Sequence, residues 1–357
     1  MVAKTRRQLA KLALLLLALL LLAAILLCVF LIPRHHRRPL PPASQPGNAS
    51  NPDDSIVAFD FSPYLIMYKS GRVHRLDGTA RCSAGVDEAT GPDRAHGTDV
   101  PAPGASGTKS KDSGRHPVLV FYHGGAFVIG SAFTPLYHAY LNGVVAVSME
   151  YRLAPEHRLP TAYDDSWQAL NWVARNAASG PEPWLRDRGN LSRLFVAGDS
   201  AGANIAHNMA METEGGGRLD GGAAITGLLV LDPYFWGKKL VAGETTDPAR
   251  RRQYEATWSF ICGGRYGIDD PRVDPLSMPA SQWRKLACSR VAVTSSGLDD
   301  FRPRGLAYAV ALNDSGCHGE IEQYETSGER HVYFLDRPKA PNFIKELAFV
   351  TGFLTRE

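Results

Sequence analysis

The chain has 357 residues, of which 44% are hydrophobic and 21% are charged, and its formal net charge is +3. This composition is typical of a globular protein of one or two domains. Basic residues gather near the N-terminus while the remainder is balanced, which argues against a nucleic-acid-binding class. The five cysteines form no CxxC pair and no metal-ligand spacing, so we expect neither a disulfide framework nor a metal site.

The first predicted element is an apolar helix near the N-terminus. Residues 12–32 form an uninterrupted apolar run of 21 residues, and a helix of that length rises about 30 Å, enough to cross a bilayer. A secretory signal peptide is the alternative, although its apolar stretch is usually about 7–15 residues. We therefore expect residues 1–33 to form a basic N-terminus and a single-pass transmembrane anchor.

The orientation of this anchor rests on a slight excess of basic residues before the run. The excess favours a cytoplasmic N-terminus and a lumenal position for the rest of the chain, with the cytosolic face as the alternative. Three N-glycosylation sequons, at Asn48, Asn190 and Asn313, matter only for a lumenal domain.

A linker and a globular region follow the apolar run. Residues 34–55 are rich in Pro, Ser and Asn and predict an extended linker. Residues 56–357 have a globular composition and predict the folded domain of the chain. Within it, residues 86–116 are polar, rich in Gly and Pro and without periodicity, which predicts a flexible loop.

The globular region alternates short β-branched runs with helical stretches. Such alternation predicts an α/β fold with a mainly parallel sheet and helices on both faces. In such sheets the chemistry sits at the carboxyl ends of the strands. The clearest strands are 118–123, 144–150, 194–198, 227–232 and 290–296, and the clearest helices are 161–177, 201–212, 302–316 and 341–357.

One stretch has the pattern of a nucleophile elbow. Residues 198-GDSAG-202 fit G-x-S-x-G between an apolar strand and a helix. Ser200 must sit in a strained turn to raise its hydroxyl above the sheet, and the flanking glycines let the neighbouring backbone approach. The helix behind Ser200 directs its dipole at developing negative charge. A plain strand-to-helix turn with an incidental serine is the alternative for this pattern taken alone.

A second stretch supplies candidate oxyanion donors. Residues 123-HGGAF-127 follow the strand 118–123, and consecutive glycines there expose backbone N–H groups. We expect the amides of Gly124, Gly125 and Ala201 to form a three-donor oxyanion hole. A flexible glycine turn is the alternative.

A serine nucleophile needs a base and an acid that orients the base. In this architecture the order along the chain is Ser, then Asp or Glu, then His. Three histidines follow Ser200: His207 within the helix, His318 before an expected edge strand, and His331 after it. His331 is favoured as the base because it lies in a loop after the expected edge strand and before the last helix. For the acid, Asp299 and Asp300 follow the strand 290–296, and spacing alone admits either.

These motifs together resemble the plant carboxylesterases, in the hormone-sensitive-lipase-like branch of the α/β hydrolases. The resemblance covers residues 59–357 and rests on 123-HGGAFVIGSAF-133, 150-EYRLAPEHRLPTAYDDSW-167, 198-GDSAGANIAHNMA-210, 233-PYFWG-237, 269-DDPRVDPL-276, 297-GLDDFRPRG-305 and 330-RHVYF-334. It implies an α/β-hydrolase fold with Ser200 as nucleophile, His331 as base, Asp299 as orienting acid, and Gly124, Gly125 and Ala201 as oxyanion donors.

The resemblance also implies a small lid formed by residues 56–80 and by an insertion at 233–289. We expect Phe127, Tyr234, Phe235 and Trp236 to contact substrate, although core packing explains these aromatic residues almost as well. The sequence departs from the family pattern in two shortened segments, near residues 91–117 and 142–144, and in the N-terminal anchor.

The expected function is that of a membrane-anchored serine carboxylesterase that hydrolyses small apolar esters, with no metal and no organic cofactor. Three alternatives use the same scaffold. A non-catalytic small-molecule receptor, like the related gibberellin receptors, would lack the catalytic histidine. A dehydratase would use the same pocket. The two shortened segments could also leave the protein inactive.

Overall fold

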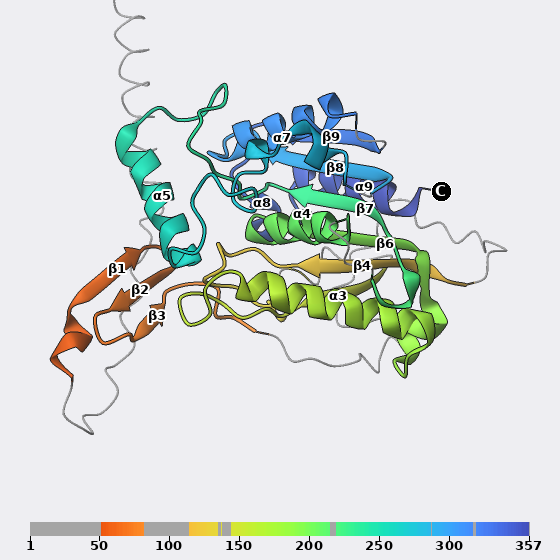
Figure 1. Ribbon diagram of the computed structural model, residues 1–357, viewed down its shortest axis with the longest axis horizontal. Helices are drawn as coiled ribbons and strands as arrows, with labels where there is room; N and C mark the ends of the chain where they lie inside the picture. The colour runs from red at the N-terminus through yellow and green to blue at the C-terminus, as the bar shows by residue number, and fades with distance from the viewer. Residues whose placement is uncertain are drawn as a thin grey trace, which may run out of the picture. The chain divides into compact units, whose positions relative to one another are not determined.

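A parallel sheet of six strands forms the centre of the structure (Figure 1). The computed structural model of the protein describes residues 51–81, 114–134, 137, 144–214, 219–286, 288–316 and 319–356. The strand order is β5-β4-β6-β7-β8-β9, and every neighbouring pair is parallel. The strands are β4 (His116–Tyr122), β5 (Val145–Met149), β6 (Gly189–Asp199), β7 (Ile225–Leu231), β8 (Arg290–Ser296) and β9 (Glu320–Thr326).

Alternate side chains of each strand enter two separate apolar cores. Val118 and Val120 of β4 pack in one core, whereas Leu119 and Phe121 pack in the other. This alternation follows from the two-residue repeat of a strand. The helices α3 (Thr161–Ser179), α4 (Ala201–Glu214) and α7 (Arg302–Asp314) contribute to the first core, and α8 (Tyr333–Asp336) and α9 (Pro341–Thr355) to the second.

The predicted α/β class with a parallel sheet and helices on both faces is therefore confirmed. All five predicted strands and all four predicted helices are present, with ends that differ by a few residues. The largest difference is β6, which begins at Gly189 rather than at residue 194 because its first residues extend the pairing with β4.

A small antiparallel sheet precedes the main sheet and was not predicted. It consists of β1 (Val57–Phe61), β2 (Leu65–Tyr68) and β3 (Val73–Arg75). It packs against α5 (Pro248–Cys262), where the rings of Phe59 and Phe260 stack with their centroids 4.0 Å apart (Figure 1). These two segments are the ones expected to form a lid, and they touch each other through aromatic side chains.

Shorter turns complete the described chain. Residues Pro52–Ser55 form a 3₁₀ turn, η1, capped by the side chain of Asn51. The remaining short elements are a π-helical turn, η2 (Trp184–Arg188), the 3₁₀ turns η3 (Asp220–Gly222) and η4 (Pro275–Ser277), and α6 (Ala280–Trp283).

The structure corrects the expected fold class and localisation in one respect. None of the described helices is both long enough and apolar enough to cross a bilayer. The predicted anchor at residues 12–32 lies outside the described residues, as do residues 34–50 of the linker, residues 86–113 of the predicted loop and the shortened segment at 142–143. A membrane-spanning helix and a single-pass membrane localisation therefore have no support in this structure.

A buried ion-pair network joins α7 to the insertion between β7 and β8. Arg304 is 1% exposed. Its Nε lies 2.7 Å from Glu244 Oε1 and its Nη1 lies 3.1 Å from Asp274 Oδ1. Its Nη2 also donates to the carbonyl oxygens of Gly237 and Lys239. The guanidinium therefore satisfies two buried carboxylates and two carbonyls at once.

Replacing Arg304 should destabilise the fold strongly. We expect Arg304→Met to lower the free energy of unfolding by about 3–5 kcal/mol, because Glu244 and Asp274 would stay buried without their shared partner. Denaturant unfolding measures the loss. Arg302→Met is the matched control, since Arg302 pairs with Glu325 at the partly exposed end of the same helix and should change stability by about 1 kcal/mol or less. Equal losses in the two variants would contradict this explanation.

Candidate active site

Ser200 occupies the sharp turn between β6 and α4. Its φ of 53° lies in the left-handed region, which is strained for a residue with a side chain. The flanking glycines make the turn possible. A Cβ on Gly202 would lie 1.9 Å from the carbonyl oxygen of Tyr122 in β4, and a Cβ on Gly198 would lie 2.3 Å from the backbone of Gly202. Glycine is therefore required at 198 and 202, as expected for G-x-S-x-G, because neighbouring backbone leaves no room for a Cβ at either position.

Three side chains meet in a hydrogen-bonded row above this turn. Ser200 Oγ lies 2.9 Å from Nε2 of His331, and Nδ1 of His331 lies 2.7 Å from Oδ2 of Asp299. The row has the geometry in which Ser200 donates to Nε2 while the Nδ1–H donates to the carboxylate. Asp299 Oδ1 accepts a further bond from the amide of Phe301, at 2.9 Å. The structure thus brings together Ser200, His331 and Asp299, the three residues that the sequence analysis expected to act together.

The other candidates for base and acid lie elsewhere. Asp300 Oδ2 accepts a hydrogen bond from the Tyr254 hydroxyl at 2.6 Å and pairs with Arg250 at 3.0 Å. His207 is buried in the core, where its Nδ1 lies 2.9 Å from the Tyr308 hydroxyl. His318 lies outside the described residues. Spacing in the sequence admitted either Asp299 or Asp300 as the partner of His331. In the structure only the Asp299 side chain contacts His331, and the Asp300 side chain contacts Tyr254 and Arg250.

The carboxylates around His331 alter its proton affinity. Burial lowers the pKa of the imidazole, but the charges of Asp299, Asp232 and Asp199 outweigh burial and raise the pKa of His331 to about 9. Asp232 is buried at the end of β7, and Asp199 is buried at the end of β6. The imidazolium form is therefore stabilised by carboxylates that lie at the ends of three neighbouring strands.

The expected role of the Gly124 amide needs a correction. This N–H points at two acceptors, Asp199 Oδ1 and the Tyr137 hydroxyl, each 2.9 Å away. Tyr137 in turn donates to Asp199 Oδ2 at 3.2 Å. The Gly124 amide is therefore already engaged by two protein acceptors. Among the described residues, the amides of Gly125 and Ala126 donate to no protein acceptor, and both residues line the cavity described below.

Asp199 is a site residue that the sequence motifs did not identify. A Cβ on Gly124 would lie 2.2 Å from Asp199 Oδ2, so this carboxyl packs directly against the glycine backbone. Burial raises the pKa of Asp199 to about 7. The signal in the sequence was an acidic residue at the variable position of G-x-S-x-G. Its partners lie 62 and 75 residues away along the chain, so no local pattern pointed to them.

A cavity of about 640 Å³ opens above Ser200. Its walls come from the segment before the main sheet, from α5, and from the loops that follow β4, β8 and β9. Aromatic and aliphatic side chains form much of the lining, among them Phe61, Tyr64, Tyr234, Tyr254, Leu298 and Phe301. Two guanidinium groups also border it, those of Arg250 and Arg330, and the first is neutralised by Asp300.

Only one of the four expected substrate-contacting aromatic residues lines this cavity, namely Tyr234. Phe127 is 1% exposed and packs against Tyr163 and Trp258 in the core. Its φ of 62° lies in the left-handed region. Phe235 and Trp236 are also fully buried and pack on Tyr308 and Tyr254. Core packing, the alternative for these residues, explains three of the four.

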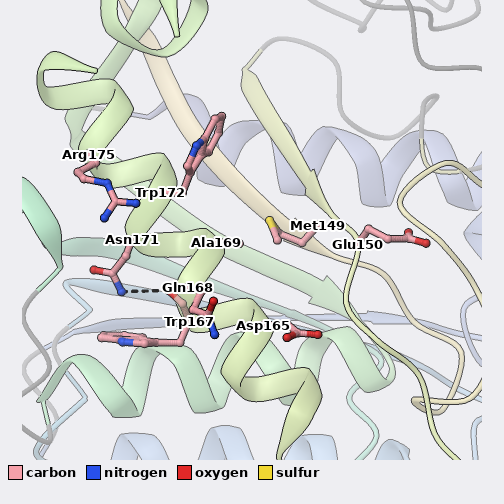
Figure 2. Close-up of a pocket in the computed structure, with 9 residues that line it drawn as sticks. All are labelled: Met149, Glu150, Asp165, Trp167, Gln168, Ala169, Asn171, Trp172 and Arg175. Carbon is pink, nitrogen blue, oxygen red and sulfur yellow. Dashed lines mark hydrogen bonds between the residues drawn. The ribbon is translucent and has the colours of Figure 1, made fainter. Parts of the chain in front are cut away.

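A second hollow, of about 650 Å³, lies beside α3 and the end of β5 (Figure 2). Its lining combines polar residues, among them Glu150, Gln168 and Arg175, with the apolar side chains of Met149, Trp167 and Trp172. The Asn171 side chain donates to the carbonyl of Trp167. No residue of the Ser200 row borders this hollow, and its described lining contains no serine, cysteine or histidine. These lining residues therefore supply neither a serine or cysteine nucleophile nor a histidine base.

Asp232, Asp299 and His331 form the one group of potential metal ligands found among the described residues. Their ligand atoms already serve as hydrogen-bond partners. His331 Nδ1 is bonded to Asp299, and the Asp232 oxygens accept from Ser296 and Val332. This arrangement is that of a hydrogen-bonded acid–base group, and a cation would have to displace those bonds.

Comparison with known proteins places this chain in a family. Residues 119–335 match the family model described as the alpha/beta hydrolase fold. The chain is 36% identical over 311 residues to "Probable carboxylesterase 2" of Arabidopsis thaliana, covering 84% of this chain and 97% of the relative. It is 39% identical over 250 residues to a 2-hydroxyisoflavanone dehydratase of Glycyrrhiza echinata, covering 67% of this chain and 76% of that protein.

A solved structure supports the same assignment. The crystal structure of an esterase from Mycobacterium marinum has a TM-score of 0.56 at 25% identity, and the match covers 67% of this chain and 72% of that one. The family model and this structure agree on the fold, and the relatives match two thirds or more of the chain. The chain therefore belongs to the α/β-hydrolase family, in the group that contains the plant carboxylesterases.

Proposed function

We propose that this protein hydrolyses carboxylic esters of small molecules through an acyl-enzyme, with Ser200 as nucleophile, His331 as general base and Asp299 as the acid that orients it. The observation that carries the proposal is the continuous row of hydrogen bonds, 2.9 Å from Ser200 to His331 and 2.7 Å from His331 to Asp299. Membership of a family with carboxylesterases supports it further.

Acylation begins when Ser200 Oγ attacks the ester carbonyl carbon. The Oγ–H bond breaks, its proton moves to His331 Nε2, and the carbonyl π electrons move to the oxygen, which becomes an oxyanion. When this intermediate collapses, the bond to the alcohol breaks and the alcohol oxygen takes the proton from His331. An acyl group then remains on Ser200.

Deacylation repeats the sequence with water. His331 takes a proton from water as the hydroxide oxygen attacks the acyl carbon, and the second intermediate releases the acid and returns the proton to Ser200. Asp299 keeps the Nδ1–H side of the ring fixed, so that Nε2 always faces Ser200 and the entering water.

The oxyanion is best stabilised by the amides of Gly125, Ala126 and Ala201. The Gly125 and Ala126 amides have no acceptor among the described residues, and Ala201 is the first residue of α4, where helix amides lack intrahelical partners. The Gly124 amide, bonded to Asp199, holds the loop in place instead. Each free donor is worth about 10²–10³ in rate.

The cavity lining favours neutral substrates with apolar groups. Aromatic side chains form much of the lining, Asp300 neutralises Arg250, and two further carboxyls, Asp77 and Asp336, also line the cavity. An anionic ester would meet these carboxylates as well as Arg330, whereas a neutral acyl group would bury apolar surface against Tyr64, Tyr234 and Phe301.

A dehydratase is the second candidate, because one relative at 39% identity is named as such. Such a reaction would use the base to remove a proton and would need no acyl-enzyme. The two activities separate in product analysis: hydrolysis converts the ester and water into an acid and an alcohol, whereas dehydration removes water from the substrate and leaves a single organic product. Ser200→Ala should abolish the first and spare much of the second.

Substitution of the hydrogen-bonded row should remove esterase activity. We expect Ser200→Ala and His331→Ala each to lower kcat for p-nitrophenyl acetate by about 10⁴-fold or more, because either change removes the nucleophilic step. Asp299→Asn should cost at least about 10²-fold. Asp300→Asn is the matched control, since it makes the same chemical change one residue away. An Asp300→Asn variant that loses as much activity as Asp299→Asn would contradict the assignment.

The rate should depend on pH through His331. The neutral imidazole is the base, and nearby carboxylates raise its pKa from 6.5 to about 9. The acidic limb of kcat/KM against pH should therefore have a midpoint well above 6.5, with activity rising into the alkaline range. A profile that is already flat from pH 6 upward would show that His331 is neutral there and that the carboxylates do not raise its pKa.

A further inference from the structure

Asp232 lies beside the proposed triad and has no part in the reaction as described so far. It follows β7, is 2% exposed, and has a φ of 41°, in the left-handed region. A buried carboxyl on a strained backbone is costly, and such a residue persists when the surrounding structure holds it in place. Its contacts show what holds it.

The Asp232 carboxyl accepts three hydrogen bonds. Oδ1 accepts from the amide of Ser296 at 2.7 Å, while Oδ2 accepts from the Ser296 hydroxyl at 2.7 Å and from the amide of Val332 at 2.8 Å. Two of these donors are backbone N–H groups, which can only donate. Burial, together with the charge of Asp299, raises the pKa of Asp232 above its ordinary value, whereas the charge of His331 and the bonds from Ser296 and Val332 favour the ionised form.

These bonds connect the two loops that carry the base and its orienting acid. Val332 directly follows His331, and its φ of 47° is unfavourable for a β-branched residue. Ser296 ends β8, and its carbonyl accepts from the amide of Asp299 at 3.1 Å. Asp232 therefore bridges the backbone next to His331 and the residue that positions Asp299.

The same carboxyl is also close to the imidazole. One ligand atom from each of Asp232, Asp299 and His331 lies within 4.8 Å of the other two. The further titratable groups that face this cluster are Asp199 at the end of β6 and Glu346 on α9, whose pKa burial raises to about 7. Glu346 is held by the hydroxyls of Thr326 and Tyr333. Among these groups, Asp232 and Asp299 are the two carboxyls whose oxygens lie within 4.8 Å of a ring nitrogen of His331.

We propose that Asp232 is a positioning residue for the reaction, which fixes the backbone next to His331 and holds a second negative charge beside the imidazole. This inference rests on the proposed ester hydrolysis. During each acylation His331 becomes positively charged, and a carboxylate fixed nearby stabilises that charge without reorganisation. The same charge makes the resting imidazole harder to deprotonate.

The two effects predict a signature that a purely structural residue would not produce. Loss of the Asp232 charge should move the acidic limb of kcat/KM downward in pH, by about one unit, while the maximal rate falls because the imidazolium loses support. A residue that only filled space would lower the rate at every pH equally and would leave the midpoint of the limb unchanged.

The test is the pH profile of p-nitrophenyl acetate hydrolysis by the full chain and by Asp232→Asn, Asp232→Ser and Asp300→Asn. Asp232→Asn keeps the shape but turns an NH₂ group toward backbone donors, so Asp232→Ser, which is smaller and has no such group, guards against a folding defect. Asp300→Asn is the control: it removes a carboxylate that is bonded to Tyr254 and Arg250 rather than facing His331.

We expect both Asp232 variants to show an acidic limb shifted to lower pH, whereas Asp300→Asn should keep the limb midpoint of the unsubstituted chain whatever its effect on substrate binding. Limbs of both Asp232 variants that coincide with the unsubstituted chain, in a protein whose turnover requires Ser200, would overturn this inference and leave the proposed function intact. Absence of any Ser200-dependent turnover at all pH values would overturn the proposed function and this inference with it.

Discussion

All the polar groups of the site depend on one constraint, the parallel direction of the six central strands. Because the strands run the same way, the residues that follow their carboxyl ends converge at one edge of the sheet. The Gly-rich loop follows β4, Ser200 follows β6, Asp232 follows β7, Asp299 follows β8, and His331 follows β9. Residues separated by as many as 131 positions thereby come within hydrogen-bonding distance.

The site concentrates acidic groups around one base. Asp199, Asp232 and Asp299 are all buried, and the charge of each favours the protonated form of His331. Asp299 bonds directly to the ring, Asp232 secures the backbone beside it, and Asp199 secures the loop with the candidate oxyanion donors. This division lets negative charge support the imidazolium, while the reacting oxygen meets backbone amides whose partial charge is positive.

The sequence predicted the parts of the site that depend on local pattern. The elbow at Ser200 and the strands of the main sheet followed from glycine spacing and apolar periodicity, whereas the choice of Asp299 over Asp300 came from family resemblance. Contacts between residues far apart in the sequence could not be predicted: the Gly124 amide donates to Asp199, and Phe127 packs against Tyr163 and Trp258 in the core. The short strands between residues 57 and 75 carry too little periodicity to predict, and the apolar N-terminal run lies outside the described residues.

The most direct test of the proposed mechanism is to find which atom of the chain becomes covalently modified. The full chain is treated with a fluorophosphonate and digested, and mass spectrometry then locates the adduct. We expect a single modified peptide carrying the phosphonate on Ser200, with labelling that is lost in His331→Ala because the serine is no longer activated. Labelling of another residue, or no labelling of the folded protein, would contradict the claim that Ser200 is an activated nucleophile.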